Sequence, residues 1–504
     1  MKKTIRLLSL LLSALMILLA FAACSGKTPG GDDTTAAQGD QTGTDIQTEA
    51  ATTVRLDDFG RPWIDDELPE KGDFGDRTFT IHTRGNVEQY EWYAPEENGE
   101  MLNDAIYRRN TTVEERYKIK LNIIAEGSWS DYGKVSLPKI TASIKTNDGF
   151  YDLLAGYGSV TSLATSGLLY DLTKLDAIKL DKPWWSQNFN DEVSVRGANY
   201  FAVGAMSLST VYSMENIFVN TDILSDSAGP GYNIYNTVKN HGWTFEELEA
   251  RAREAWQDKN GNGQTDSGDI VGMTLGDSGG NAAYGFMFCT GLRLTFHDSE
   301  GALTTEGFDL DKNVQIIDEV IKLLYESEGV IPNDQTSCNF ADGTSLFCFH
   351  WLYWGQTKYA KNMDHYGVIP MPLLNKDQPD YVTPVQAGMH IYCIPIDVKD
   401  VGQNSIITEA LAAESYRTLL PSYYEIILKT KYAKDAETSQ MIDIIYNTAS
   451  FDFAYIFRSD SDYSSQVRNI ITSKTNTLSS TYKAIKKSAE SSFATLNQAL
   501  SPKN

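Results

Sequence analysis

The feature that most restricts the fold is a regular alternation of strand-like and helix-like segments between residues 76 and 159. Residues 76–85 and 119–125 alternate apolar and polar side chains, as half-buried strands do. A second helix-like segment near residues 134–147 leads into the short apolar strand YDLLAGYGS. The apolar side chains at helical spacing in the first helix-like segment are Leu102, Ile106, Val113 and Tyr117. This order predicts parallel β–α–β units in an α/β layer structure.

The remainder of the chain repeats the same kinds of segment. Thr244 and Glu247 form a capping-box pattern, which predicts where one helix begins. A chain of 504 residues exceeds one small core, so we expect two α/β lobes. Strand-like stretches are 199–209, 215–224, 345–355 and 386–397, and helix-like stretches are 241–257, 312–329, 407–420, 437–449 and 465–500.

The N-terminus has the pattern of a secretory signal, because a basic start precedes an apolar run that ends in small residues. The following FAACSG resembles the lipobox of bacterial lipoproteins, in which the cysteine, here Cys24, is lipidated and becomes the mature N-terminus; Phe21 stands where leucine is usual. We therefore expect a lipoprotein signal peptide over residues 1–23 and a lipid-anchored flexible linker over 24–75, on the extracellular face of the cell membrane. An ordinary signal peptide with an incidental cysteine is the alternative.

Acidic residues outnumber basic residues by 67 to 43, and the net charge is −24. Such a charge argues against nucleic acid and anionic lipid surfaces as partners, and it suits an exported protein with neutral or cationic ligands. The cysteines after Cys24 show no CxxC spacing, so a zinc site is not expected. Cys338 and Cys348 could form a disulfide, or Cys348 could be a buried thiol.

Several stretches together resemble the extracellular solute-binding proteins of bacterial ABC importers, in the carbohydrate-binding branch and its Gram-positive lipoprotein form. They occur in the family's order over residues 76–460, with an insert, DSAGPGYNIYNTVKNHG, that is longer than in the simplest members. The stretches are AIYRRNTTVEERYKIKL, YDLLAGYGSVTSLATSGLLYDLTKL, KPWWSQNFNDEVSVRGANYFAVGAMSLS, ENIFVNTDIL with WTFEELEARA, and CNFADGTSLFCFHWLYWG.

The resemblance implies a two-lobed, periplasmic-binding-protein-like α/β fold of type II, with crossing strands between the lobes and a ligand cleft between them. Lobe 1 is expected from residues 76–205 and about 385–450, lobe 2 from 206–384, and C-terminal helices packing on the lobes from 451–504. The resemblance also implies a monomeric receptor, not an enzyme, that captures a mono- or oligosaccharide and delivers it to the transmembrane permease of an ABC importer.

A sugar cleft needs flat aromatic side chains for the apolar ring faces and polar side chains for the hydroxyls. The family places these residues just beyond strand ends, and its tryptophan at the end of the SLFCFHW strand stacks on sugar. The aromatic candidates in such places are Trp92, Tyr93, Trp129, Tyr132, Tyr157, Trp184, Trp185, Trp351, Tyr353 and Trp354, and for each of them core packing is the alternative. Candidate polar partners are Arg84, Glu91, Glu215, Asn216 and His390, whereas Trp243 and Trp256 are expected in the core and Asp152 in a structural role.

The stretch DKNGNGQTDSGD has the spacing of a calcium loop, with Gly263 at the turn. Because there is one loop and no outgoing helix, we expect a structural Ca²⁺ rather than a calcium sensor. Solute-binding proteins of the family carry a similar loop after the same helix, and a metal-free Asn-Gly turn is the alternative. The ligand positions are filled by Asp258, Asn260, Asn262, Gln264 through its carbonyl, Asp266 and Asp269, the last where an EF-hand has glutamate.

Two other classes of function stay open at this stage. A secreted glycoside hydrolase would need a carboxylate pair at a set separation, and no motif marks one. A surface adhesion or scaffold protein is suggested by the dockerin-like loop, although dockerins carry two such loops. The GDSGG at residues 276–280 lacks the context of a serine protease.

Overall fold

A computed structural model describes residues 55–85, 91–128, 130–275, 279–331, 340–427, 436–458 and 462–502. The expected signal peptide, the lipidation site Cys24, Trp129 and Cys338 lie outside these residues. Residues 55–504 form one compact unit. In its described part, no helix is both long enough and apolar enough to cross a membrane.

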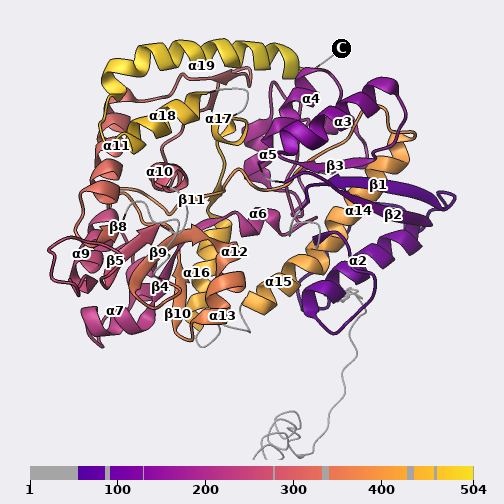
Figure 1. Cartoon of the computed structure of the whole chain (residues 1–504). Helices are drawn as coiled ribbons and strands as arrows, with labels where there is room; N and C mark the ends of the chain where they lie inside the picture. The colour runs from indigo at the N-terminus through magenta and orange to yellow at the C-terminus, as the bar shows by residue number, and fades with distance from the viewer. Residues whose placement is uncertain are drawn as a thin grey trace, which may run out of the picture. The chain divides into compact units, whose positions relative to one another are not determined.

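The first sheet has four strands in the order β12–β3–β1–β2. Figure 1 shows β3, β1 and β2 side by side. β1 is parallel to both β2 and β3, and β12 is antiparallel to β3. The helices α2 and α3 make the two crossovers, so the predicted β–α–β order is confirmed. These elements are β1 (Arg77–Thr83), α2 (Met101–Tyr117), β2 (Ile119–Ala125), α3 (Tyr132–Thr146), β3 (Leu153–Gly156) and β12 (Ile391–Cys393).

The second sheet has five strands in the order β10–β4–β9–β5–β8. β5 is parallel to β8 and β9, whereas β4 is antiparallel to β9 and β10. Helix α9 packs against β5, and its N-cap is as predicted, because the Thr244 hydroxyl accepts from the Glu247 amide at 3.3 Å. The elements are β4 (Glu215–Asn220), α7 (Thr221–Ala228), α8 (Ile234–Lys239), α9 (Phe245–Ala255), β5 (Val271–Leu275), α10 (Gly279–Phe288), α11 (Leu310–Tyr325), β8 (Val330–Ile331), β9 (Ser345–Trp351), α12 (Leu352–Trp354), α13 (Ala360–Asn362) and β10 (Tyr366–Ile369).

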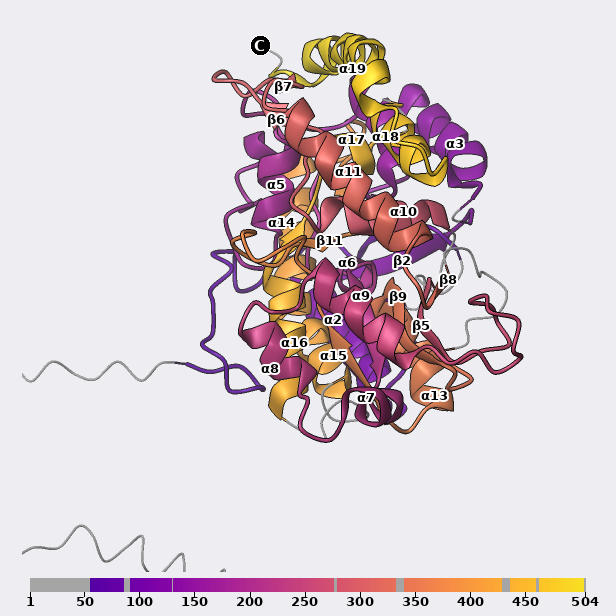
Figure 2. The same ribbon diagram turned by 90° about the vertical axis from the view of Figure 1, so that its left-hand side faces the viewer.

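Segments that join or flank the two sheets complete the fold (Figure 2). The chain passes from the first sheet to the second before β4 and returns between β10 and β12, and β11 pairs with β13 beside these crossings. Helix α19 contacts α4 as well as α11 and β7. The remaining elements are α4 (Thr161–Thr165), α5 (Gln187–Val193), α6 (Ser209–Tyr212), β6 (Phe296–His297), β7 (Leu303–Thr304), β11 (Thr383–Pro384), α14 (Val401–Arg417), α15 (Leu419–Ile427), α16 (Ala436–Asn447), β13 (Ala449–Ser450), α17 (Phe453–Ile456), α18 (Tyr463–Thr472) and α19 (Leu478–Leu500).

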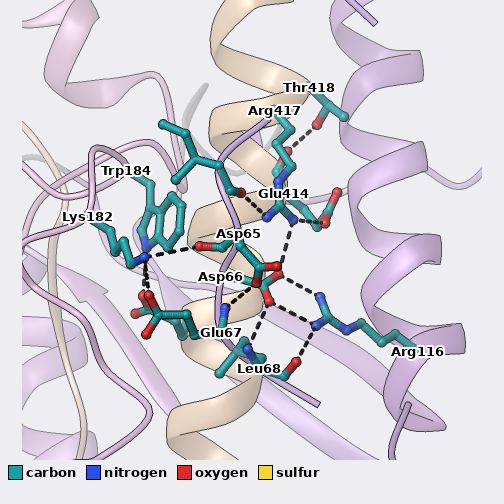
Figure 3. A network of polar contacts seen from close by, with 12 residues as sticks. Asp65, Asp66, Glu67, Leu68, Arg116, Lys182, Trp184, Glu414, Arg417 and Thr418 are labelled. Atoms are coloured by element: carbon teal, nitrogen blue, oxygen red, sulfur yellow. Dashed lines mark hydrogen bonds and ion pairs between the residues drawn. The ribbon is translucent and has the colours of Figure 1, made fainter. Parts of the chain in front are cut away.

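The prediction of a flexible linker as far as residue 75 is wrong for residues 55–75, which belong to the folded unit. From Arg55 onward the chain is bound to α2 and α14, and Figure 3 shows Asp66 between Arg116 and Arg417. Lys182 also holds this segment, through the Glu67 carboxylate at 2.6 Å. These contacts come from residues far away in the sequence, which is why the polar composition near residue 60 did not reveal them.

Two further expectations are corrected by the structure. Residues 199–209 are buried as predicted for an apolar segment, but they form isolated bridges, such as Ala202 with Tyr392, rather than a strand. Helix α16 was expected in lobe 1, yet it packs against β10 and α8 of the second sheet, where Glu437 pairs with Lys239 at 3.0 Å. Its apolar side chains predicted a helix, but they carried no information on which sheet would receive it.

Candidate functional site

A cavity of about 200 Å³ lies at the edge of the first sheet where β1, β2 and β3 end. Parallel strands bring their carboxyl ends to one edge of a sheet, and this is the usual place for ligand sites in α/β folds. Tyr157 follows β3 directly, and Tyr132 begins α3 after β2. The walls of the cavity are Tyr132, Gly133, Tyr157, Gly158, Ser159, Ala387, Ile456 and Arg458.

The two tyrosines of this cavity are held in place by buried neighbours. Their rings meet edge to face, with centroids 5.4 Å apart. The Tyr132 hydroxyl lies 3.4 Å from Nδ1 of His82, and burial lowers the pKa of this histidine to about 4, so it is neutral at physiological pH. The guanidinium of Arg84 lies 4.4 Å from the centre of the Tyr157 ring, at cation–π distance.

His390 links the first sheet to the crossing segment beneath this cavity edge. Its Nε2 lies 3.3 Å from the Thr83 hydroxyl, and its Nδ1 lies 3.0 Å from the Ser207 hydroxyl. Burial, reinforced by the charge of Arg84, lowers the pKa of His390 well below its ordinary value. His390 is therefore a neutral, hydrogen-bonded core residue.

Polar side chains from the second sheet and from the returning chain are buried where the two halves meet. Glu215 and Asn216 begin β4, and Gln386 follows β11. The backbone N–H of Gln386 donates to the Ser213 carbonyl at 2.8 Å. All three side chains are at most 1% exposed. The side-chain amides of Asn216 and Gln386 have no hydrogen-bond partner within the described residues, which is uncommon for buried polar groups and typical of sites that receive a polar ligand or water.

Trp351 and Trp354 both pack against His350 at the end of β9. The two indole rings lie 5.4 and 4.4 Å from the imidazole, and both tryptophans are only partly buried. A π-helical turn, Gly355–Tyr359, follows directly, and such turns are frequent at functional sites. Tyr353 instead packs edge to face on Tyr212.

Trp184 and Trp185 share one acceptor in the crossing region. Their indole N–H groups donate to the two oxygens of Glu409, at 2.8 and 3.0 Å. Burial raises the pKa of Glu409 to about 7, although both indole donors act in the opposite direction. The two tryptophans also line a second cavity of about 260 Å³, whose walls include Thr210 and Met214.

The remaining predicted site residues lie apart from these cavities. Trp92 is fully buried in the core, with its ring 6.0 Å from that of Tyr392, and Glu91 beside it is also buried. Tyr93 is 61% exposed. As expected for core residues, Trp243 is fully buried and donates to the Pro370 carbonyl.

The structure also places three residues for which the sequence predicted a role outside the cleft. Trp256 is half-buried and donates from its indole to Asp269 at 3.2 Å. Asp152 has the expected structural role, because it accepts from the Thr80 amide and pairs with Arg77. Cys348 is fully buried, with its Sγ 3.3 Å from the Tyr359 hydroxyl.

Arg458 and Gln386 were not among the sequence candidates. Both lie in segments that come back to the cavity region late in the chain. The search for binding residues just beyond the strand ends of the first sheet therefore did not select them. The aromatic run FDFAYIF before Arg458 was the one available signal, because a buried apolar segment fixes the side chain that follows it.

The calcium-like loop forms a closed turn stabilised by its own side chains. The Asp258 carboxylate accepts from the amides of Gly261, at 2.6 Å, and Gly263, at 2.8 Å. Both Asn260 and Asn262 donate from their side chains to Asp266. The carboxylate and amide oxygens suit a hard cation, although no cluster of three acidic, histidine or cysteine side chains able to hold a metal occurs in the described residues.

Two α/β sheets joined by crossing segments, with polar and aromatic side chains buried between them, define the two-lobed class of periplasmic-binding-protein-like folds. The chain belongs to the bacterial extracellular solute-binding proteins, whose family model matches residues 111–440. The family expected from the sequence motifs is thereby confirmed.

Solved structures agree on the fold. A sugar transporter of Rhizobium etli in an open conformation has a TM-score of 0.52 at 13% identity, over 84% of this chain and 98% of that one. UspC of M. tuberculosis has a TM-score of 0.50 at 11% identity, over 84% of this chain and 100% of that one. At these identities the likeness concerns the fold alone. A search of curated protein sequences finds no significant match.

Proposed function

We propose that this solute-binding protein captures a carbohydrate between its two sheets and passes it to the transmembrane permease of an ABC importer. The observation that carries the proposal is the cavity at the carboxyl ends of the first sheet, walled by Tyr132 and Tyr157. Aromatic faces suit the C–H faces of sugars, and the buried amides of Asn216 and Gln386 suit their hydroxyls. The name of the R. etli neighbour, a sugar transporter, supports the same ligand class.

The proposal includes a lipid anchor on Cys24 and a protein that acts as a monomer. The chain from Arg55 onward is bound to α2 and α14, so a lipid on Cys24 would hold the folded unit through residues 24–54. A lipid tether would keep the receptor near its permease at the outer membrane face.

We also propose that the loop from Asp258 to Asp269 holds a structural Ca²⁺. Asp258, Asn260, Asn262 and Asp266 would supply side-chain oxygens and Gln264 its carbonyl, while Asp269 already closes the loop through the amide of Lys259 at 3.0 Å. The ion would stabilise the connection between α9 and β5 rather than act as a switch.

Neither a glycoside hydrolase nor a scaffold protein is favoured by a specific observation. Membership in a family of solute-binding proteins points to capture without chemical change of the ligand. We therefore retain one function.

Tryptophan fluorescence and calorimetric titration with a panel of neutral and charged mono- to oligosaccharides would test the proposal. We expect at least one sugar to bind. Tyr157→Ala should weaken that binding at least tenfold, because the contact between the sugar ring and the aromatic face of Tyr157 is lost. Phe150→Ala is the control, since Phe150 is a half-exposed aromatic outside the cavity. No binding by a folded protein across the panel would refute the carbohydrate function.

A further inference from the structure

Among the described residues that wall the Tyr157 cavity, Arg458 is the one with a charged side chain. It is held there by α17, whose N-cap Asp452 accepts from the Leu294 amide at 2.8 Å and from the Tyr455 amide at 3.3 Å. The segment is pressed closely against the cavity wall, because a Cβ added to Gly158 would lie 2.1 Å from the Ile456 carbonyl oxygen. The position of Arg458 is therefore fixed by packing on both sides.

In the part of the chain that the structure describes, aromatic rings lie next to Arg458. Its guanidinium carbon lies 5.7 Å from the centre of the Tyr455 ring and 6.0 Å from that of Tyr284. Within the described residues no ion pair joins Arg458 to a carboxylate, in a chain with 67 acidic side chains. Glu215, the buried carboxylate of β4, does not line this cavity.

A second guanidinium adds to the positive character of this site. Arg84 lies against the ring of Tyr157, and it is buried. Tyr157 is thus in contact with the buried guanidinium of Arg84 and shares its cavity with the guanidinium of Arg458. The volume of about 200 Å³ is below that of sites for large ligands, so we expect one ring of an oligosaccharide to enter here.

We propose that the solute is an acidic saccharide, whose carboxylate or sulfate group is bound by Arg458 while its ring contacts Tyr157. The planar guanidinium matches such oxyanions with two parallel hydrogen bonds. This inference rests on the proposed carbohydrate function. It differs from the expectation of neutral or cationic ligands that the net charge suggests. Net charge acts at long range and is screened within about 8 Å at physiological ionic strength, whereas the cavity wall acts at contact.

Calorimetric titration of the full extracellular chain with matched pairs of sugars tests the proposal. The carboxylate arm compares glucuronic acid with glucose and trigalacturonic acid with α-1,4-galactotriose, and the sulfate arm compares glucose 6-sulfate with glucose. We expect at least one acidic probe to bind tenfold or more tightly than its neutral partner, and raising the salt concentration to weaken only the acidic probe. The arm that responds identifies the oxyanion.

Arg458→Gln and Arg468→Gln separate contact from general charge. The Arg468 guanidinium lies 5.6 Å from the Tyr284 ring, but Arg468 does not line the cavity. We expect Arg458→Gln to weaken the acidic probe at least tenfold and the neutral partner less than threefold, and Arg468→Gln to change neither by more than threefold. Thermal melting confirms that each variant is folded.

The possible failures are distinguishable. If neutral sugars bind and acidic ones bind no more tightly, or if both arginine variants lose the same affinity, the acidic-saccharide inference is wrong and the carbohydrate function stands. If no probe of either kind binds to the folded protein, the inference falls together with the proposed function.

Discussion

Arg116 and Asp66 form a bidentate ion pair, with Nη1 to Oδ2 at 2.7 Å and Nη2 to Oδ1 at 3.0 Å (Figure 3). Arg417 approaches the same carboxylate at 3.1 Å and donates to the Ile64 carbonyl at 2.7 Å. The Asp66 side chain is 5% exposed. Since α2 carries Arg116 and α14 carries Arg417, this carboxylate binds the segment after Arg55 to two helices beside the first sheet.

Replacing Asp66 by Asn should destabilise the protein markedly. The variant would leave the largely buried guanidinium of Arg116 without a carboxylate partner and would leave Arg417 paired with Glu414 alone, which costs about 3 kcal/mol in the free energy of unfolding. Urea unfolding measures this change. Asp73→Asn is the matched control, because the Asp73–Lys118 pair at 2.6 Å is more than half exposed and solvent screens such a pair, so its loss should change stability little. Equal effects of the two substitutions would contradict the role given to Asp66.

The same carboxylate predicts a dependence of stability on acid. Burial by itself would raise the pKa of Asp66, but hydrogen bonds from Arg116 and the Leu68 amide and the charges of Arg116 and Arg417 outweigh it, and the pKa falls to about 2. Because this is below the ordinary value of 3.8, the stabilisation is present above about pH 4 and is lost as the pH falls toward about 2. The difference in unfolding free energy between wild type and Asp66→Asn should shrink over this window, and a constant difference would argue against it.

Glu409 predicts a pH dependence of the opposite sign. Its pKa is raised to about 7 from an ordinary value of 4.5, so the folded state holds the proton more tightly than the unfolded state. The contribution to stability is therefore fully present below about pH 4.5 and is lost as the pH rises through about 7. The stability of wild type relative to Glu409→Gln should fall over that range in urea unfolding. Glu300→Gln, at an exposed glutamate, should show no such trend.

Gly158→Ala should disturb the cavity, whereas Gly133→Ala should not. The new methyl group at residue 158 would overlap the Ile456 carbonyl oxygen at 2.1 Å, and the backbone would have to move, at a cost of about 1–3 kcal/mol. At Gly133, which lines the same cavity, the nearest atom would be 3.9 Å away, on Ser159. Thermal melting and sugar titration should both separate the two variants. Unchanged binding by Gly158→Ala would show that the segment before Arg458 does not shape the site.

Calcium should raise the melting temperature slightly. With a dissociation constant of about 10⁻⁴ to 10⁻³ M, 10 mM Ca²⁺ would add roughly 1.4–2.7 kcal/mol, or about 1–3 °C for a domain of this size. Asp258→Ala should abolish the response to Ca²⁺ and to EDTA. Mg²⁺ at the same concentration is the control for a general ionic effect. A melting temperature that changes with neither EDTA nor Ca²⁺ would refute the proposed Ca²⁺ site.

Elements with a clear local period were predicted well. The strand expected at residues 119–125 matches β2 residue for residue, and the start expected at Glu215 is that of β4. Residues 199–209 are equally apolar but form no strand, because a segment crossing between lobes can be buried by neighbours on all sides without a continuous ladder. Burial was thus predictable there, and hydrogen-bond pattern was not.

The candidate site was predictable in part. Tyr132 and Tyr157 follow strand ends, and parallel strands place their ends together, so residue type and order were sufficient to select them. The positions of the tryptophans were harder to predict, because residue type does not distinguish a core tryptophan from one in a cleft. The burial of Trp92 and Trp184 follows from their contacts with Tyr392 and Glu409, which lie far away in the sequence. For Arg458 the one sequence signal was the aromatic run FDFAYIF before it, which predicts a buried segment but not the cavity that the segment reaches.

By itself the sequence determined the order of strands and helices, the cap at Thr244 and the family of the protein, because each depends on patterns within short stretches. Only the tertiary structure decided that Arg458 would line the same cavity as Tyr157, and that Asp66 would meet Arg417 across 351 positions. Such meetings depend on how distant segments pack and exclude water around a shared carboxylate or cavity. The spacing of residues along the chain does not contain that information.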